Sequence, residues 1–257
     1  MPKADINGIK LNYEVTGDGE PVILITGFAG TTAFWNNTVP LLSDNYKVIT
    51  LDNRGVGSTK YNGKFTIEAM ADDVIALMDH LSIFDAHIVG WSMGTTISHR
   101  IALKYPERVS TLTFISPYAK RPARSSYIMN TAIQMVKEGA DFDHFSRILN
   151  SFCFSEDVFF DKEKKGSKIK LPAKMDIRGI EDQMKALDVY DGRWDMNKIQ
   201  FNTLVIHGTK DIMVPPWIGE IIADTIPSSK LVMVPKAGHI IHPSDYIAVL
   251  KEHLSGK

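Results

Sequence analysis

The segment Gly90-Trp91-Ser92-Met93-Gly94 constrains the fold of this chain more than any other feature. It follows the apolar run 86–89 and precedes the stretch 95–104, which is compatible with a helix. A strand, then G-x-S-x-G, then a helix is the context that a nucleophile elbow requires. The turn is so tight that a Cβ at either glycine would collide with neighbouring backbone. We therefore expect Ser92 to have strained φ/ψ angles, with its Oγ projecting from the top of a sheet.

Two further polar residues follow later strands. The run 203–207 predicts a buried strand, and the loop after it carries Asp211. The run 231–234 predicts another strand, and His239 follows it. Because the carboxyl ends of parallel strands meet at one edge of a sheet, we expect Ser92, Asp211 and His239 to converge there. In such a trio the imidazole accepts the hydroxyl proton during attack, and the carboxylate holds the imidazole in the required tautomer.

A fourth segment completes the predicted site. The apolar strand 21–26 is followed by Gly27-Phe28-Ala29-Gly30. Where this loop accompanies a nucleophile elbow, it provides one backbone N–H of an oxyanion hole, and the residue after the nucleophile provides the other. The spacing assigns these donors to Phe28 and Met93. One such donor typically contributes roughly 10²–10³ in turnover.

These segments together resemble the α/β-hydrolase superfamily, in particular its small esterases, enol-lactonases and cofactor-free haloperoxidase-like members. The Ser-Asp-His chain order is that of the family. Residues 51–58 resemble its D-x-R-G-x-G-x-S loop, residues 65–74 its next helix, and His207-Gly-Thr-Lys-Asp211 its acid motif. One departure is Thr26-Gly27, where the family often has His-Gly; the backbone donors survive this change.

The remaining pattern alternates strands with helices, which indicates a mostly parallel sheet flanked by crossover helices. Asn7-Gly8 predicts an N-terminal hairpin at the edge of that sheet. The eight predicted strands are near 3–6, 9–15, 22–26, 47–52, 86–90, 111–116, 203–207 and 231–234, and the helices near 32–42, 67–81, 93–105, 216–226 and 243–254.

No strand-like run occurs between residues 117 and 198. Helical periodicity there predicts helices at 125–138, 141–150, 156–165 and 172–190. We therefore predict an α/β-hydrolase core of residues 1–116 and 199–257, with a helical cap of residues 117–198 inserted in it. Such a cap would cover the catalytic residues, exclude water and shape the substrate pocket.

Three residues are candidates for the substrate pocket: Trp91, Met129 and Trp194. Methionines in the cap could form an adaptable apolar pocket, but for any single one we favour ordinary helix–helix packing. A lysine cluster between residues 162 and 174 could attract anionic substrates, but we interpret it as a solvated surface. Cys153 is the single cysteine, which excludes an intramolecular disulfide, and we interpret it as a packed thiol.

Composition excludes several classes of partner. With 29 basic and 30 acidic residues the net charge is −1, which argues against nucleic acid as the principal partner. The N-terminus has no apolar signal region and no apolar run approaches the ~18 residues of a membrane span, so we predict a cytoplasmic protein without stable membrane insertion. His239-x-x-His242 has the spacing of a metal-ligand pair but lacks a third ligand, so neither metal nor cofactor is predicted. The sequence indicates no particular oligomeric state.

The leading hypothesis is a serine hydrolase that cleaves a small carboxylic ester or lactone through an acyl-enzyme. Perhydrolase chemistry and carbon–carbon bond hydrolysis on the same site are alternatives. A serine at position 92 argues against haloalkane dehalogenases and most epoxide hydrolases of this fold, because those enzymes use a carboxylate as nucleophile. A protein of a different class, a small-molecule receptor that retains these residues, also stays open.

Overall fold

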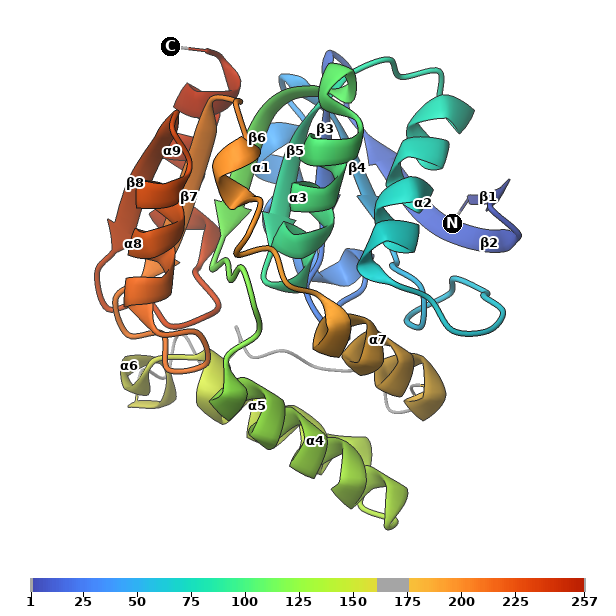
Figure 1. The fold of residues 1–257 in the computed structure, drawn as a ribbon, viewed down its shortest axis with the longest axis vertical. Helices are drawn as coiled ribbons and strands as arrows, with labels where there is room; N and C mark the ends of the chain where they lie inside the picture. The colour runs from blue at the N-terminus through green and yellow to red at the C-terminus, as the bar shows by residue number, and fades with distance from the viewer. Residues whose placement is uncertain (1, 161–175, 257) are drawn as a thin grey trace.

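A computed structural model describes residues 2–160 and 176–256. Its centre is an eight-stranded sheet with the order β1-β2-β4-β3-β5-β6-β7-β8 (Figure 1). β1 and β2 pair in antiparallel fashion, β2 runs antiparallel to β4, and the other neighbours are parallel. This confirms the predicted mostly parallel sheet. The strands are β1 Lys3–Ile6, β2 Ile9–Thr16, β3 Glu20–Ile25, β4 Tyr46–Leu51, β5 Ala86–Trp91, β6 Val109–Ile115, β7 Thr203–Gly208 and β8 Ser229–Val234.

The N-terminal hairpin forms at the predicted turn. Ile6 pairs with Ile9, and both intervening residues have positive φ, 45° at Asn7 and 72° at Gly8. Two consecutive positive φ values match the right-handed twist of hairpin strands, and Asn-Gly adopts them at low cost. By contrast, β5 and β7 are buried along their whole length, as expected for parallel strands covered on both faces.

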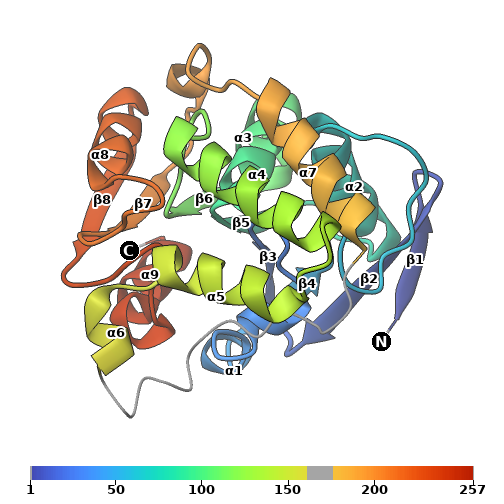
Figure 2. The same cartoon turned by 90° about the horizontal axis from the view of Figure 1, so that it is seen from below.

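Helices cover both faces of the sheet (Figures 1 and 2). One face carries α2 (Ile67–His80), α3 (Met93–Lys104) and α8 (Pro216–Thr225), whereas the other carries α1 (Val39–Leu42) and α9 (Ile247–Leu254). Each layer has its own apolar cluster. The first includes Met70, Ile97 and Ile222, and the second includes Leu42 and Leu250.

Two predicted helices are shorter than expected. The segment 32–42 contains a 3₁₀ helix, η1 (Thr32–Trp35), and then α1, while 243–254 contains η5 (Pro243–Asp245) and then α9. Pro40 explains the first interruption, because it stands in the first turn of α1, where no N–H is needed. The second interruption falls at Tyr246, whose φ of −132° and ψ of −11° are not helical. Two other 3₁₀ helices are η2 (Pro106–Arg108) and η4 (Met196–Lys198).

The segment between β6 and β7 is helical in its described part. It contains α4 (Ala123–Lys137), α5 (Phe142–Cys153), α6 (Glu156–Phe160) and α7 (Ile177–Val189). Figure 2 shows α4, α5 and α7 crossing the carboxyl-terminal edge of the parallel strands. The predicted helices 156–165 and 172–190 extend into residues 161–175, which lie outside the described residues, as does the lysine cluster.

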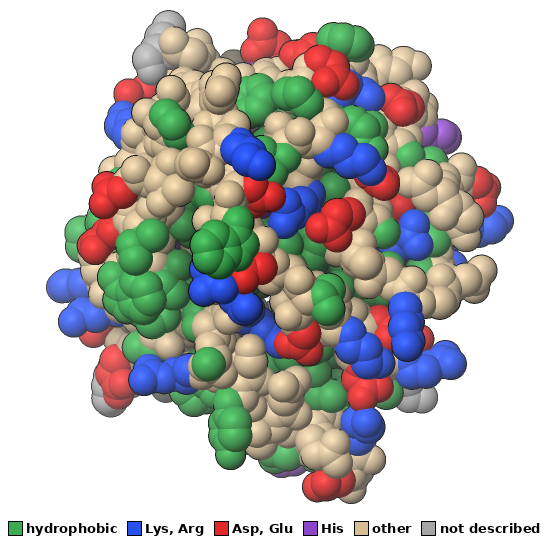
Figure 3. Space-filling view, viewed as in Figure 1, with side chains coloured by type: hydrophobic (Ala, Val, Ile, Leu, Met, Phe, Trp, Pro, Cys, Tyr) green, Lys and Arg blue, Asp and Glu red, His purple; other side chains and the backbone are tan. Residues whose placement is uncertain are grey.

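The surface in Figure 3 carries acidic and basic side chains interspersed, with apolar side chains gathered over the region of α8. Trp217 and Ile221 of this helix are exposed. Among the helices of the described residues, none has the length and apolarity needed to cross a membrane.

Candidate active site

Ser92 stands at the sharp turn between β5 and α3, with φ 53° and ψ −117°. The two glycines of the motif make this turn possible. A Cβ on Gly90 would lie 2.5 Å from the Gly94 carbonyl oxygen, and a Cβ on Gly94 would overlap the Ile25 carbonyl oxygen. The predicted strain at Ser92 is therefore present, and the backbone geometry is that of a nucleophile elbow.

The structure brings together the three residues predicted from the strand ends. Ser92 follows β5, Asp211 follows β7 and His239 follows β8. His239 Nε2 lies 2.9 Å from Ser92 Oγ, and His239 Nδ1 lies 2.7 Å from Asp211 Oδ2. All three residues are buried. This arrangement allows a proton to pass from the hydroxyl to the imidazole while the carboxylate holds the ring.

A second imidazole contacts the same carboxylate. His207 Nε2 lies 3.2 Å from Asp211 Oδ2 and 3.0 Å from the Val214 carbonyl oxygen. Both of these oxygens accept hydrogen bonds, so the proton of His207 resides on Nε2. Burial alone would raise the pKa of Asp211, but the charge of His239 and the hydrogen bonds from His207 and His239 outweigh it and lower the pKa to about 2. This contact was not predicted from the sequence, although His207 and Asp211 stand only four residues apart.

The loop of His239 is fixed through its backbone. Trp91 Nε1 donates to the His239 carbonyl oxygen at 3.1 Å, and Ser116 Oγ donates to the same oxygen at 2.7 Å. The Trp91 ring stacks on Phe34 with a centroid distance of 4.1 Å. Trp91 therefore both lines the pocket and holds the imidazole loop in place.

The predicted oxyanion donors are Phe28, which lines the same cavity as Ser92, and Met93, which directly follows Ser92 in the chain. Within the described residues, the amides of Phe28 and Met93 make no hydrogen bond to the protein. The neighbouring Ala29 N–H is occupied, because it donates to Gln183 Oε1 of α7 at 3.0 Å. Gln183 Nε2 in turn donates to the Arg54 carbonyl oxygen at 2.7 Å. The buried Gln183 thus ties α7 to the loop of Phe28, a contact that helical periodicity does not reveal.

A cavity of about 40 Å³ adjoins Ser92 and His239. Its wall includes Trp91 and Met129, which were predicted as pocket residues, and Phe28, which was predicted as the loop donor. The rest of its wall is mostly apolar and comes from Tyr118, Arg121, Pro122, Ser125, Leu149, Cys153, Leu187, Met213 and Val214. Burial raises the pKa of the Cys153 thiol, which fits a packed, protonated side chain.

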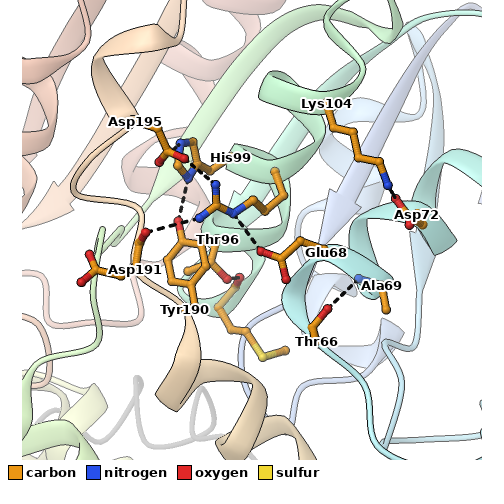
Figure 4. A network of polar contacts seen from close by, with 12 residues as sticks. Thr66, Glu68, Ala69, Asp72, Thr96, His99, Lys104, Tyr190, Asp191 and Asp195 are labelled. Carbon is orange, nitrogen blue, oxygen red and sulfur yellow. Dashed lines mark hydrogen bonds and ion pairs between the residues drawn. The ribbon is translucent and has the colours of Figure 1, made fainter.

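The interpretation of Trp194 as a pocket residue is wrong. Its side chain is 78% exposed, is absent from the cavity wall and contacts the Arg193 guanidinium, 5.7 Å from the ring centroid. The reason lies in the path of the chain after α7. Tyr190 and Asp195 flank this residue and bind to α3, so the intervening segment follows the outside of the core (Figure 4).

That attachment is a partly buried polar network (Figure 4). The Tyr190 hydroxyl lies 2.7 Å from His99 Nδ1, and Arg100 binds Asp195 at 2.7 Å and Glu68 of α2 at 3.2 Å. Burial, followed by the charge of Arg100, lowers the pKa of His99 to about 4. The network joins the end of the helical segment to the helix that begins at Ser92.

The strand order, the elbow and the hydrogen-bonded Ser-His-Asp arrangement are those of the α/β hydrolases. The model of the alpha/beta hydrolase fold family matches residues 20–246, and the chain belongs to this family.

Among solved structures, the enol-lactonase from Burkholderia xenovorans LB400 superposes with a TM-score of 0.88 at 23% identity, covering 99% of this chain and 100% of that one. A thermophilic esterase from Thermogutta terrifontis gives a TM-score of 0.84 at 26% identity, with 99% and 95% coverage. BpoC of Mycobacterium tuberculosis is 29% identical over 241 residues, which are 90% of this chain and 91% of BpoC.

Proposed function

We propose that this protein is a serine hydrolase that cleaves a small carboxylic ester or lactone through an acyl-enzyme. The observation that carries the proposal is the relay of Ser92 Oγ, His239 and Asp211, with distances of 2.9 and 2.7 Å between hydrogen-bonding atoms. An esterase and an enol-lactonase among the structural neighbours support this reaction class.

In the proposed reaction, Ser92 Oγ attacks the carbonyl carbon while its proton passes to His239 Nε2. The oxyanion receives hydrogen bonds from the Phe28 and Met93 amides. His239 then protonates the leaving alkoxide as the ester C–O bond breaks. A water that gives its proton to His239 attacks the acyl-enzyme, which releases the acid and restores the Ser92 hydroxyl. With a lactone, the alcohol stays attached to the acyl group and leaves with the acid in one product.

The cavity sets the expected size of the acyl group. One water needs ~10–15 Å³ of the space that a water-sized sphere can occupy. The cavity of about 40 Å³ is only a few times larger than that volume, so it is small. Its small volume favours a short acyl chain over a long one.

The test is turnover of p-nitrophenyl esters from acetate to octanoate by the native protein and by Ser92→Ala. Ser151→Ala is the matched control, because Ser151 is an exposed serine of α5 that does not line the cavity. We expect multiple turnover with an optimum at the shortest acyl groups, unchanged in Ser151→Ala and reduced by at least ~10³-fold in Ser92→Ala. A single acylation without further turnover would instead indicate a ligand receptor, and no reaction with any ester would reject the proposal.

A further inference from the structure

Arg121 places a cationic group in the wall of the cavity beside Ser92. It follows β6 and directly precedes the N-cap of α4, and its side chain is 4% exposed. In the described part of the chain, the cavity wall contains no other Lys or Arg and no Asp or Glu. A charged side chain so well buried normally has a full set of partners, because an unpaired buried charge is costly.

The partners of Arg121 are incomplete. Nη2 binds the Asp188 carboxylate, and Nη1 lies 2.7 Å from the Met184 sulfur, which is a weak acceptor. Nε has no hydrogen-bond partner within the described residues. Asp188 is itself 52% exposed, so water weakens its attraction for the guanidinium. An ion pair that only joined the start of α4 to α7 would not require a guanidinium whose buried Nε–H has no acceptor among the residues described.

The charge of Arg121 also reaches a residue in the same cavity wall, Tyr118. Burial raises the pKa of Tyr118, while the positive charge of Arg121 and a hydrogen bond with Ser92 counteract part of this rise. Tyr118 lines the cavity together with Arg121 and Ser92. The first turn of α4 adds to the same field, because Pro122 and Ser125 line the cavity and the helix has no side-chain cap at its N-terminus.

We propose that the cavity binds a carboxylate at Arg121, so that the substrate is a small ester or lactone whose acyl part carries a carboxylate. That the bound molecule is a substrate rests on the proposed function, whereas the anion site itself does not. Nε–H and a neighbouring Nη–H of a guanidinium can bind a carboxylate in a two-pronged contact. The small cavity leaves room for one or two methylene groups between the ester carbonyl and this carboxylate.

The test compares two p-nitrophenyl esters of the same shape, the succinate half-ester and the 4-methylpentanoate ester, in which an isopropyl group replaces the carboxylate. Arg121→Gln removes the charge, and Arg121→Lys keeps the charge without the planar fork. Arg124→Gln is the matched control, because Arg124 is exposed and does not line the cavity. We expect the native protein and Arg124→Gln to prefer the succinate half-ester in kcat/KM. In Arg121→Gln, kcat/KM for that ester alone should fall about 10–100-fold. The value for Arg121→Lys should lie between those of the native protein and Arg121→Gln.

A second measurement does not depend on turnover. Succinate should raise the thermal midpoint of the native protein and of Arg124→Gln, whereas succinamide, which has the same shape without a carboxylate, should not, and the shift should be absent in Arg121→Gln. If Arg121→Gln does not fold, Arg121→Lys should show a reduced shift.

Hydrolysis of both esters at similar rates, without Arg121-dependent binding of succinate, would overturn the inference and leave the proposed function standing. Arg121-dependent binding of succinate without turnover of either ester would reject the proposed function and retain the anion site. If neither ester is hydrolysed and succinate does not bind, both the proposed function and the anion site are rejected.

Discussion

His207 and His239 contact the same oxygen atom, Oδ2 of Asp211, at 3.2 and 2.7 Å. The other oxygen, Oδ1, accepts the Val214 N–H at 2.8 Å. Within the described residues, His207 Nδ1 has no hydrogen-bond partner, and it faces Gly219, where a Cβ would overlap it. His207 is thus a hydrogen-bond donor held in a fixed orientation, and it positions the carboxylate that in turn positions His239.

Replacement of His207 by leucine should therefore change the pH dependence of catalysis. Loss of one donor raises the pKa of Asp211 from about 2, because fewer hydrogen bonds stabilise its charged form. The carboxylate is the active form, so the part of the acid limb of kcat/KM that reports Asp211 should move to higher pH with a short ester as substrate. We expect kcat to fall about 10-fold or more, since misplaced catalytic groups lose rate steeply.

Two variants separate this effect from a general loss of packing. His207→Gln keeps an N–H donor of similar reach, and should recover much of the activity and the acid limb. His253→Leu removes another buried histidine, which binds the Leu112 carbonyl oxygen at 3.1 Å far from Asp211. It should lower stability and leave the pH profile in place. An unchanged acid limb in His207→Leu would show that His207 is merely structural.

The elbow glycines should be intolerant of even one methyl group. In Gly94→Ala the new Cβ would overlap the Ile25 carbonyl oxygen, and neither strand β3 nor helix α3 can move without disturbing the buried sheet. We expect a loss of about 2–4 kcal/mol in the free energy of unfolding, measured in urea. Gly63→Ala is the control: φ there is 70° and no atom lies within 4 Å of the added Cβ, so it should cost only about 1–2 kcal/mol. Equal losses would contradict the steric explanation.

The parts of the site that the sequence predicted are those governed by the backbone. Gly90 and Gly94 reveal the elbow because a tight turn restricts residue types locally, and Asp211 and His239 are recognisable because each follows a strand. Arg121 and Gln183 were not predicted, since their places depend on how α4 and α7 dock on the sheet, which helical periodicity does not specify. Trp194 was misplaced for the same reason: the anchors at Tyr190 and Asp195 direct its segment along α3.

Gln183 offers a test of the coupling between α7 and the oxyanion loop. Gln183→Leu removes the acceptor of the Ala29 N–H and the donor to the Arg54 carbonyl oxygen. The loop of Phe28 then loses its fixed position, so we expect kcat for short esters to fall about 10-fold or more with little change in KM. Gln183→Glu keeps the acceptor for Ala29 and should retain more of kcat. A change confined to KM would argue that Gln183 shapes the pocket and does not order the loop.

The His99 network should make the fold sensitive to acid. Burial lowers the pKa of His99 from 6.5 to about 4, so between these values the unfolded chain binds a proton that the folded protein excludes. Stability is therefore full above pH 6.5 and falls as the pH decreases toward 4, by up to about 3 kcal/mol from this residue. The free energy of unfolding, measured in urea at several pH values, should decrease less steeply in His99→Gln than in the native protein. Parallel pH dependences would show that another group causes the acid sensitivity. His253, whose pKa burial also lowers, is the first to substitute in that case, because its protonation would oppose folding in the same direction.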